Sequence, residues 1–91
     1  MSNLSDFEIK RVLANLKLSD TVNAARCRNC EDVVISLYTH DWVACNCFHS
    51  DKNNIHGFFI DGGFSYKHSG GNLNDMEVLN TYGEYLEAVK N

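Results

Sequence analysis

Four cysteines in two close pairs constrain the fold of this chain more than any other feature. Cys27 and Cys30 are separated by two residues, Cys45 and Cys47 by one, and the two pairs by fourteen. A C-x-x-C turn directs both sulfur atoms toward one tetrahedral ion, and alternate residues of an extended strand also point to one side. Because the interval between the pairs suits a β-hairpin, which returns the chain to its start, we expect all four thiolates to bind one ion.

Zinc is the metal expected at such a site. The chain has 91 residues, enough for a single domain over residues 1–91. Chains below roughly 70–80 residues usually need a metal, disulfides or a partner to fold, and because little surface is buried at this size we expect such a staple here as well. The first twenty residues lack the order of a secretory signal, and no run approaches the roughly 18 apolar residues of a membrane span. We therefore expect a cytoplasmic location, where thiols stay reduced and bind metal rather than form disulfides. Buried or paired thiols without a metal are the alternative.

Histidine offers a variant of the ligand set. If one cysteine points away from the ion, His49 or His40 is the natural substitute, which gives a Cys₃His site. Either set fills all four positions around the zinc and leaves none for water, so the metal is expected to be structural and the protein not an enzyme. His40 and Asp41 are adjacent, and a capping role in a turn is favoured over a catalytic pair.

The surrounding pattern predicts an α+β fold, in which small zinc-ribbon-like β-hairpins are flanked by an N-terminal helix and a C-terminal helical region. A helix is expected over residues 5–18, because Ser5 and Glu8 can form a capping box and apolar residues follow at helical spacing. The β core is expected over residues 24–68. The C-terminal helical region is expected over residues 73–90, with Thr81 and Glu84 as a further capping box.

Two hairpins are expected within the β core. The first joins the β-branched run at 33–35 to Trp42-Val43, and the second turns at Asp61-Gly62-Gly63 between 58–60 and 64–66. The polar segment 48–57 is expected to be a loop. A short helical turn is expected up to Ala25, and the Ser-Gly-Gly-Asn run at 69–72 is expected to end the second hairpin.

Charge separates the functional classes. A formal net charge of −4 disfavours a protein that binds nucleic-acid phosphates, so we expect a protein-binding module. Such a module would present the loop 48–57 or the aromatic side chains of Trp42, Phe58, Phe64 and Tyr66. A nucleic-acid-binding zinc ribbon is the alternative, because several basic residues gather in the first third of the chain: Lys10, Arg11, Lys17, Arg26 and Arg28. No membrane partner is expected.

Residues 24–80 resemble a group of short phage and prophage zinc-ribbon-like proteins of uncharacterised function. In that group a C-x-x-C pair is followed by a His-Asp-aromatic-Val-x-Cys-x-Cys string and an Asp-Gly-Gly turn, which here are His40 to Cys47 and Asp61 to Gly63. The resemblance implies a zinc site, a phage origin and a place in the host cytoplasm. By analogy, it implies inhibition of a host defence system such as CRISPR or a nuclease. This chain departs from the pattern in lacking a glycine after Cys47 and in its longer 48–57 loop.

Overall fold

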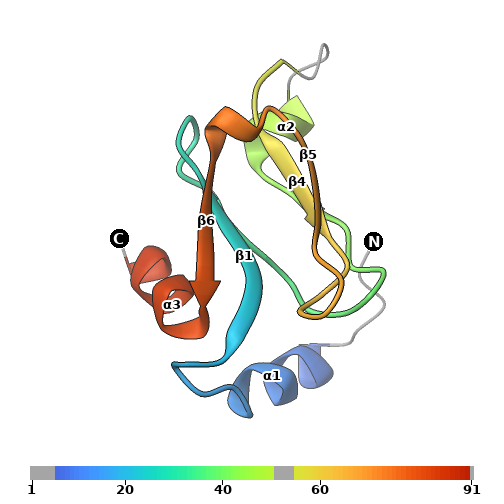
Figure 1. The fold of residues 1–91 in the computed structure, drawn as a ribbon, viewed down its shortest axis with the longest axis vertical. Helices are drawn as coiled ribbons and strands as arrows, with labels where there is room; N and C mark the ends of the chain where they lie inside the picture. Colours follow the sequence, from blue (N-terminus) through green and yellow to red (C-terminus); the bar gives the residue numbers. More distant parts are fainter. Residues whose placement is uncertain (1–5, 51–54, 91) are drawn as a thin grey trace.

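The computed structural model describes residues 6–50 and 55–90, with side chains described from Lys10 onward within those ranges. It contains two three-stranded antiparallel sheets with helices at both ends, which confirms the predicted α+β fold (Figure 1). The elements are α1 (Asp6–Ala14), β1 (Thr21–Cys27), β2 (Val33–Ser36), β3 (Val43–Ala44), α2 (Asn46–Ser50), β4 (Phe58–Asp61), β5 (His68–Gly71), the 3-10 turn η1 (Leu73–Asp75), β6 (Met76–Thr81) and α3 (Tyr82–Lys90).

The first sheet has the strand order β2-β1-β6, and β1 is its central strand. β1 buries both of its faces: Ala25 and Cys27 pack toward the second sheet, and Val22 and Ala24 pack toward α3. The prediction of a helical turn up to Ala25 was wrong. Alanine has little intrinsic preference for strands, and here its small side chain suits a strand that is covered on two sides.

The second sheet has the order β3-β4-β5, and it confirms a hairpin that turns at Asp61-Gly62-Gly63. Gly62 and Gly63 have φ angles of 93° and 65°, which only glycine adopts readily. The returning strand is 68–71 rather than the predicted 64–66. Gly70, expected to break the hairpin, lies opposite Phe59, whose ring would overlap a Cβ atom at that position. The ring therefore covers the glycine and compensates for its missing side chain.

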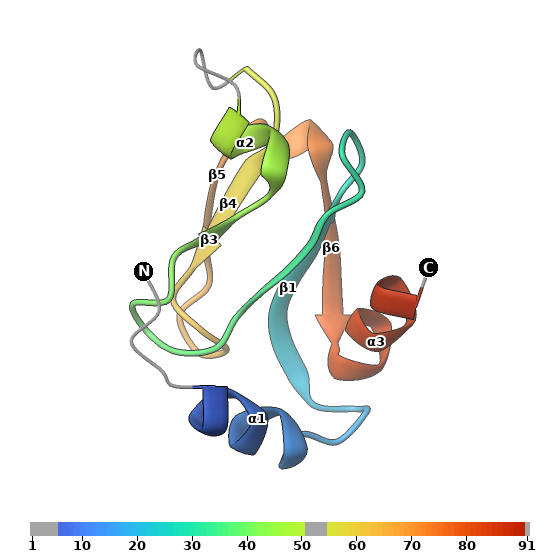
Figure 2. The ribbon, with the colours of Figure 1, turned by 180° about the vertical axis from the view of Figure 1, so that it is seen from behind.

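The first predicted hairpin does not form, because its two halves belong to different sheets. β2 pairs with β1, whereas β3 pairs with β4. The segment between them, residues 37–42, carries the chain from one sheet to the other, as Figure 2 shows from behind. The sequence correctly predicted a strand over the β-branched run at 33–35. It did not predict the partner strand, β1, because the sequence of β1 is not typical of a strand.

The C-terminal region is helical only in its second half. α3 begins at Tyr82, where the Thr81 hydroxyl accepts a hydrogen bond from the Glu84 amide at 3.2 Å. The Glu84 carboxylate accepts from the Asn80 amide at 2.9 Å, so the predicted capping pair is present, although its second bond reaches one residue further back. The expected helix over 73–81 is wrong. Those residues form η1 and β6, and β6 completes the first sheet.

The N-terminal helix is confirmed over Asp6–Ala14 and is shorter than the predicted 5–18. Its predicted start at Ser5 lies outside the described residues. The chain beyond Ala14 turns instead, and the Asp20 carboxylate accepts a hydrogen bond from the Lys17 amide at 2.8 Å. Within the part of the chain that is described, no helix has the length and apolar character needed to cross a bilayer.

Candidate metal centre

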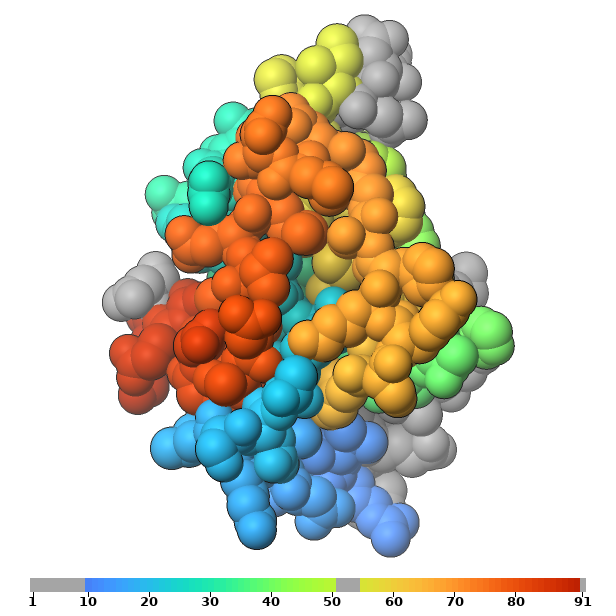
Figure 3. All heavy atoms as spheres, in the orientation of Figure 1, coloured from blue at the N-terminus to red at the C-terminus, as the bar shows by residue number. Residues whose placement is uncertain are grey.

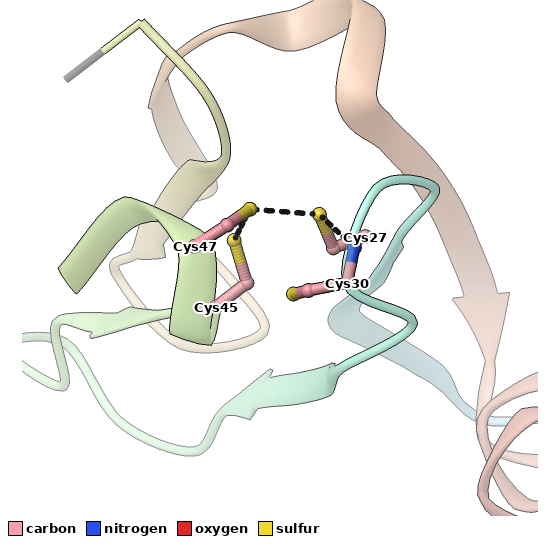
Figure 4. Close-up of side chains that lie close together, drawn as sticks. All are labelled: Cys27, Cys30, Cys45 and Cys47. Carbon is pink, nitrogen blue, oxygen red and sulfur yellow. Dashed lines mark hydrogen bonds between the residues drawn. The ribbon is translucent and has the colours of Figure 1, made fainter. Parts of the chain in front are cut away.

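The four cysteines lie in or directly after strands of both sheets and meet at one end of the gap between the sheets (Figure 4). Cys27 ends β1 and Cys30 lies in the loop after it, whereas Cys45 follows β3 and Cys47 lies in α2. All four sulfur atoms lie within 4.8 Å of one another. The two pairs that are close in sequence therefore converge on one point, as the spacing predicted.

The distances between sulfur atoms match a tetrahedral ion better than a disulfide. The Sγ atom of Cys47 lies 3.4 Å from that of Cys27 and 3.5 Å from that of Cys45. Four thiolates at about 2.3 Å from one zinc ion would be about 3.8 Å apart, whereas a disulfide bond measures about 2.05 Å. All four cysteines are free. The group can hold a metal ion after small side-chain movements.

Main-chain amides donate hydrogen bonds to two of the sulfur atoms. The Cys30 amide lies 3.5 Å from the Cys27 sulfur, and the Phe58 amide lies 3.4 Å from the Cys45 sulfur. The loop after Cys27 is closed by a 2.8 Å bond from the Glu31 amide to the Cys27 carbonyl, and Glu31 has a φ of 65°. Hydrogen bonds to sulfur stabilise the thiolate form that a metal requires.

Gly57 allows the chain to pass directly beside the second cysteine pair. A Cβ atom at this position would lie 2.7 Å from the Cys45 sulfur and 2.8 Å from the Cys47 sulfur, and the φ of Gly57 is 84°. Any other residue would therefore displace the sulfur atoms and strain the backbone. Sequence reasoning missed this glycine, because it interpreted the segment 48–57 as a loop that could face a partner. The loop prediction was wrong at residues 48–50, which belong to α2.

Two aspartates fix the segments that carry the cysteines, and sequence reasoning missed both of them. The Asp32 carboxylate accepts from the Asn46 amide at 3.1 Å, between the two residues of the second pair. The Asp75 carboxylate accepts from the Gly57 amide at 2.8 Å. The main-chain carbonyls of both residues also accept hydrogen bonds. The Cys27 amide donates to the Asp32 carbonyl at 2.8 Å, and the Arg28 amide donates to the Asp75 carbonyl at 2.8 Å. The arrangement resembles the outer hydrogen bonds that orient metal ligands.

Burial affects the thiols unequally. It raises the pKa of Cys27 and, together with the neighbouring Cys27 and Cys45 thiols, raises the pKa of Cys47. Burial also acts to raise the pKa of Cys30, but main-chain hydrogen bonds from Asp32 and Cys47 outweigh it, so that the pKa is lowered. Protons therefore compete with a metal ion most strongly at Cys27 and Cys47, because a ligand must lose its proton to bind.

Neither candidate histidine joins the four thiols. Within residues 6–50 and 55–90, the cysteines are the only group of three or more histidine, cysteine or acidic side chains placed to hold a metal ion. His40 is exposed in the turn before β3. His49 is exposed on α2, where its ring makes an edge contact with Trp42 at a centroid distance of 5.8 Å. The geometry thus favours the Cys₄ set over the Cys₃His variant.

The adjacent pair His40-Asp41 does not form a catalytic arrangement. Asp41 is buried, and its carboxylate accepts a 2.8 Å bond from the Leu37 amide, which closes the turn between β2 and β3. His40 is exposed, and its main-chain carbonyl accepts from the Trp42 amide at 3.1 Å. Asp41 therefore has the capping role that was expected for this pair.

The aromatic residues expected to face a partner lie in different surroundings. Trp42 is 37% exposed and stacks on Phe59 at a centroid distance of 5.5 Å, while Tyr66 is 63% exposed. Phe64 is half-buried and packs against the core cluster of Val22, Ala24 and Leu79. Phe58 was wrongly chosen, because it is fully buried between the sheets beside Cys45. It occupies an inward position of β4, and alternate residues of a strand face opposite sides.

Together, the fold and the site define a small α+β protein in which a four-thiol cluster joins two antiparallel sheets. No family model, curated protein or solved structure matches this chain. The resemblance to phage zinc-ribbon-like proteins therefore stays a prediction, which rests on the residues that carry it. His40 to Val43 form the turn at the end of the gap opposite the four cysteines, and the start of β3. Asp61 to Gly63 form the neighbouring β4–β5 turn.

Proposed function

We propose that this chain binds one structural zinc ion through Cys27, Cys30, Cys45 and Cys47 and acts as a protein-binding module. The convergence of four buried or half-buried thiols from two sheets carries the proposal. Zinc suits a tetrahedral set of four sulfur ligands, and a closed set of this kind leaves no position for a reacting water molecule. A role in catalysis is therefore not proposed.

Elemental analysis tests the metal. We expect about one zinc per chain in metal-replete protein, and none after Cys45→Ser, because each thiolate completes the site. Iron is the matched comparison, since four cysteines also hold iron in tetrahedral sites. One equivalent of iron in place of zinc, or no metal at all, would overturn the zinc assignment.

The distribution of charge supports a protein partner over a nucleic acid. The basic residues of the first third do not gather on one surface: Lys10 and Arg11 lie on α1 at one end of the molecule, and Arg28 follows β1 at the other. The molecule is 37 Å long, and Arg26 lies 3.6 Å from the carboxylate of Glu31. Phosphate binding needs a continuous basic stripe, and the net charge is −4.

A pair of titrations tests this choice. Labelled duplex DNA should bind more weakly than the roughly 10⁻⁴–10⁻⁶ M typical of non-specific binders at physiological salt. Tight binding that falls steeply with salt and disappears in an Arg28→Ala variant would support the nucleic-acid alternative instead.

The narrower proposal, that the partner is a host defence protein such as a CRISPR effector or a nuclease, rests on the phage resemblance alone. Affinity capture from infected cells, with the wild type beside Trp42→Ala, tests it. The partner should be retained by the wild type and lost by the variant. A captured set that is the same for both proteins, or that contains no defence protein, would contradict this narrower proposal.

A further inference from the structure

β2 and β3 are edge strands of different sheets, and both line the same apolar groove. The groove has a volume of about 580 Å³, within the roughly 300–1,000 Å³ range of ligand pockets. No main-chain hydrogen bond joins β2 to β3 in the described part of the chain. Figure 2 shows the two strands diverging from the turn at 37–42. The β2–β3 groove is lined by Val34, Ile35, Trp42, Val43, Ala44 and His49.

The register of β2 decides which of its main-chain groups face away from the sheet. The Cys27 amide donates to the Asp32 carbonyl at 2.8 Å, and hydrogen-bonded positions alternate along an antiparallel pair. Asp32 and Val34 therefore bond to β1. Val33 and Ile35, at the alternate positions, direct their N–H and C=O groups away from β1 and toward the open edge.

The same reasoning applies to β3. The Cys45 amide donates to the Phe58 carbonyl at 3.3 Å, so Cys45 and Val43 are the positions that bond to β4. Ala44 lies between them and directs its main-chain groups away from β4, at the side where it lines the groove. Both walls of the groove thus present main-chain donors and acceptors that no residue in the described part of the chain pairs.

The β6 edge of the first sheet differs. By the same alternation, the amides of Met76, Val78 and Asn80 point away from β1. The Met76 amide donates to the Leu73 carbonyl, and the Asn80 amide donates to the Glu84 carboxylate at 2.9 Å. Only Val78 keeps an open amide there. Figure 3 shows the face of the molecule on which β5, η1 and β6 lie, with part of β1 visible between these elements. The chain protects its β6 edge and leaves the β2 edge open.

We propose that the β2–β3 groove binds an extended segment of the partner protein, which pairs as an added strand with β2. This inference rests on the proposed protein-binding function and specifies its surface. Unpaired main-chain groups at Ile35 require an extended partner backbone, and the apolar walls require an apolar side chain against Trp42. The net charge of −4 favours a segment with basic residues at its solvent-facing positions.

The probe is a capped peptide of alternating lysine and valine, titrated into zinc-loaded wild-type protein. Trp42 is the only tryptophan, so its fluorescence reports binding directly. Amide NMR signals of Val33, Ile35 and Ala44 should shift on binding. The matched probe carries an N-methyl group on its central valine and cannot donate a strand hydrogen bond. It should bind about tenfold more weakly.

Two proline variants locate the edge. Ile35→Pro removes an amide that makes no bond to β1, so the β1–β2 ladder is kept while the open edge loses its donor. Val78→Pro makes the equivalent change on β6 and is the matched control. We expect Ile35→Pro to weaken peptide binding about tenfold and Val78→Pro to leave it unchanged. Zinc content shows whether each variant keeps its fold.

Several results would overturn this proposal. Absence of peptide binding by the wild type, equal binding of the N-methyl peptide, or loss of binding in Val78→Pro alone would each do so. If Ile35→Pro fails to fold, the comparison of the two peptides on the wild-type protein still tests the proposal. Concentration-dependent dimerisation that Ile35→Pro abolishes would also overturn it, because a second copy of this chain would then occupy the β2–β3 groove. Failure here with one zinc per chain still bound would leave the proposed metal function intact.

Discussion

The two sheets approach each other at both ends of the gap between them, with four free thiols at one end and hydrogen bonds at the other. We call the first the metal end, after the zinc ion proposed there. At the first end two cysteines come from each side. At the second end, which we call the polar end, the Ser36 hydroxyl accepts from the Gly63 amide at 2.9 Å and donates to the Asp41 carbonyl at 2.7 Å. The Asn23 side chain donates to the Asp61 carbonyl at 2.8 Å.

The difference between the ends lies in the strength of their interactions. A buried hydrogen bond contributes about 0.5–1.5 kcal/mol to stability, whereas structural zinc contributes on the order of 10 kcal/mol of apparent free energy. A small domain has about 5–15 kcal/mol in total. The polar end thus fixes how the turns at 37–42 and 62–63 meet, while the proposed zinc ion at the other end should decide whether the sheets stay together.

The largest effect should follow from breaking the metal end. Addition of a strong chelator, or Cys27→Ser, should abolish cooperative unfolding, because the metal's contribution is comparable with the whole stability of the domain. Circular dichroism and amide NMR dispersion measure the outcome. Ser36→Ala, at the polar end, is the control and should keep one zinc. A chelated protein with an unchanged melting transition would show that packing alone holds the sheets.

A smaller effect is expected from substituting two glycines, one at each end of the gap. Gly57→Ala places a Cβ atom 2.7 Å from the Cys45 sulfur and should lower zinc affinity about 10–100-fold, as losses of outer-shell support do. Gly62→Ala, at the polar end, would overlap the Tyr66 carbonyl at a φ of 93° and should destabilise the β4–β5 turn without changing zinc affinity.

Competition with a chromophoric chelator measures zinc affinity for both glycine variants. Equal losses of affinity in the two variants would mean that the ends are coupled rather than separate.

The hydrogen bonds of the polar end should contribute less again. Ser36 is fully buried and its hydroxyl makes two bonds, so Ser36→Ala should lower the free energy of unfolding by about 1–3 kcal/mol. Urea titration of the zinc-loaded protein measures the change. Ser65→Ala, at an exposed position of the β4–β5 turn, should stay within about 0.5 kcal/mol of the wild type. A Ser36→Ala protein as stable as that control would refute a stabilising role for the polar end.

The sequence predicted the metal end well, because its signal is local. Two residues between Cys27 and Cys30, and one between Cys45 and Cys47, suffice to direct each pair of sulfur atoms. The supporting groups were missed because they are distant in sequence: Asp75 reaches the Gly57 amide across eighteen positions. At the polar end the turn at 61–63 was predicted, but its bond to Ser36 spans twenty-seven positions.

The errors in the fold have a common physical cause. In β6, Met76 and Leu79 are three positions apart and continue into Tyr82, a spacing that fits a helical stripe as well as a strand followed by a helix. Ala24 and Ala25 in β1 favour a helix locally, and only burial between α3 and the second sheet makes them strand residues. In both cases the deciding contacts lie on other elements.

The smallest effect concerns α3, which lies outside both ends. Burial raises the pKa of Tyr85 above 10.0, and the adjacent Tyr82, whose ring stacks at 6.0 Å, adds an electrostatic contribution. The folded protein thus holds this phenolic proton more tightly than the unfolded chain does. Its contribution to stability is complete below the unfolded pKa of about 10 and is lost as pH rises through the folded pKa.

Tyr85→Phe should therefore make the free energy of unfolding fall less steeply above about pH 10 than it does in the wild type. Urea titrations at several alkaline pH values measure the slope, and Tyr66→Phe, at an exposed tyrosine, controls for the loss of one phenol. The proposed zinc site should respond in the opposite direction, because cysteine thiols bind zinc only after they lose their protons. Equal alkaline slopes in wild type and Tyr85→Phe would mean that α3 loosens before Tyr85 ionises, so that burial of this phenol would contribute nothing to the pH dependence of stability.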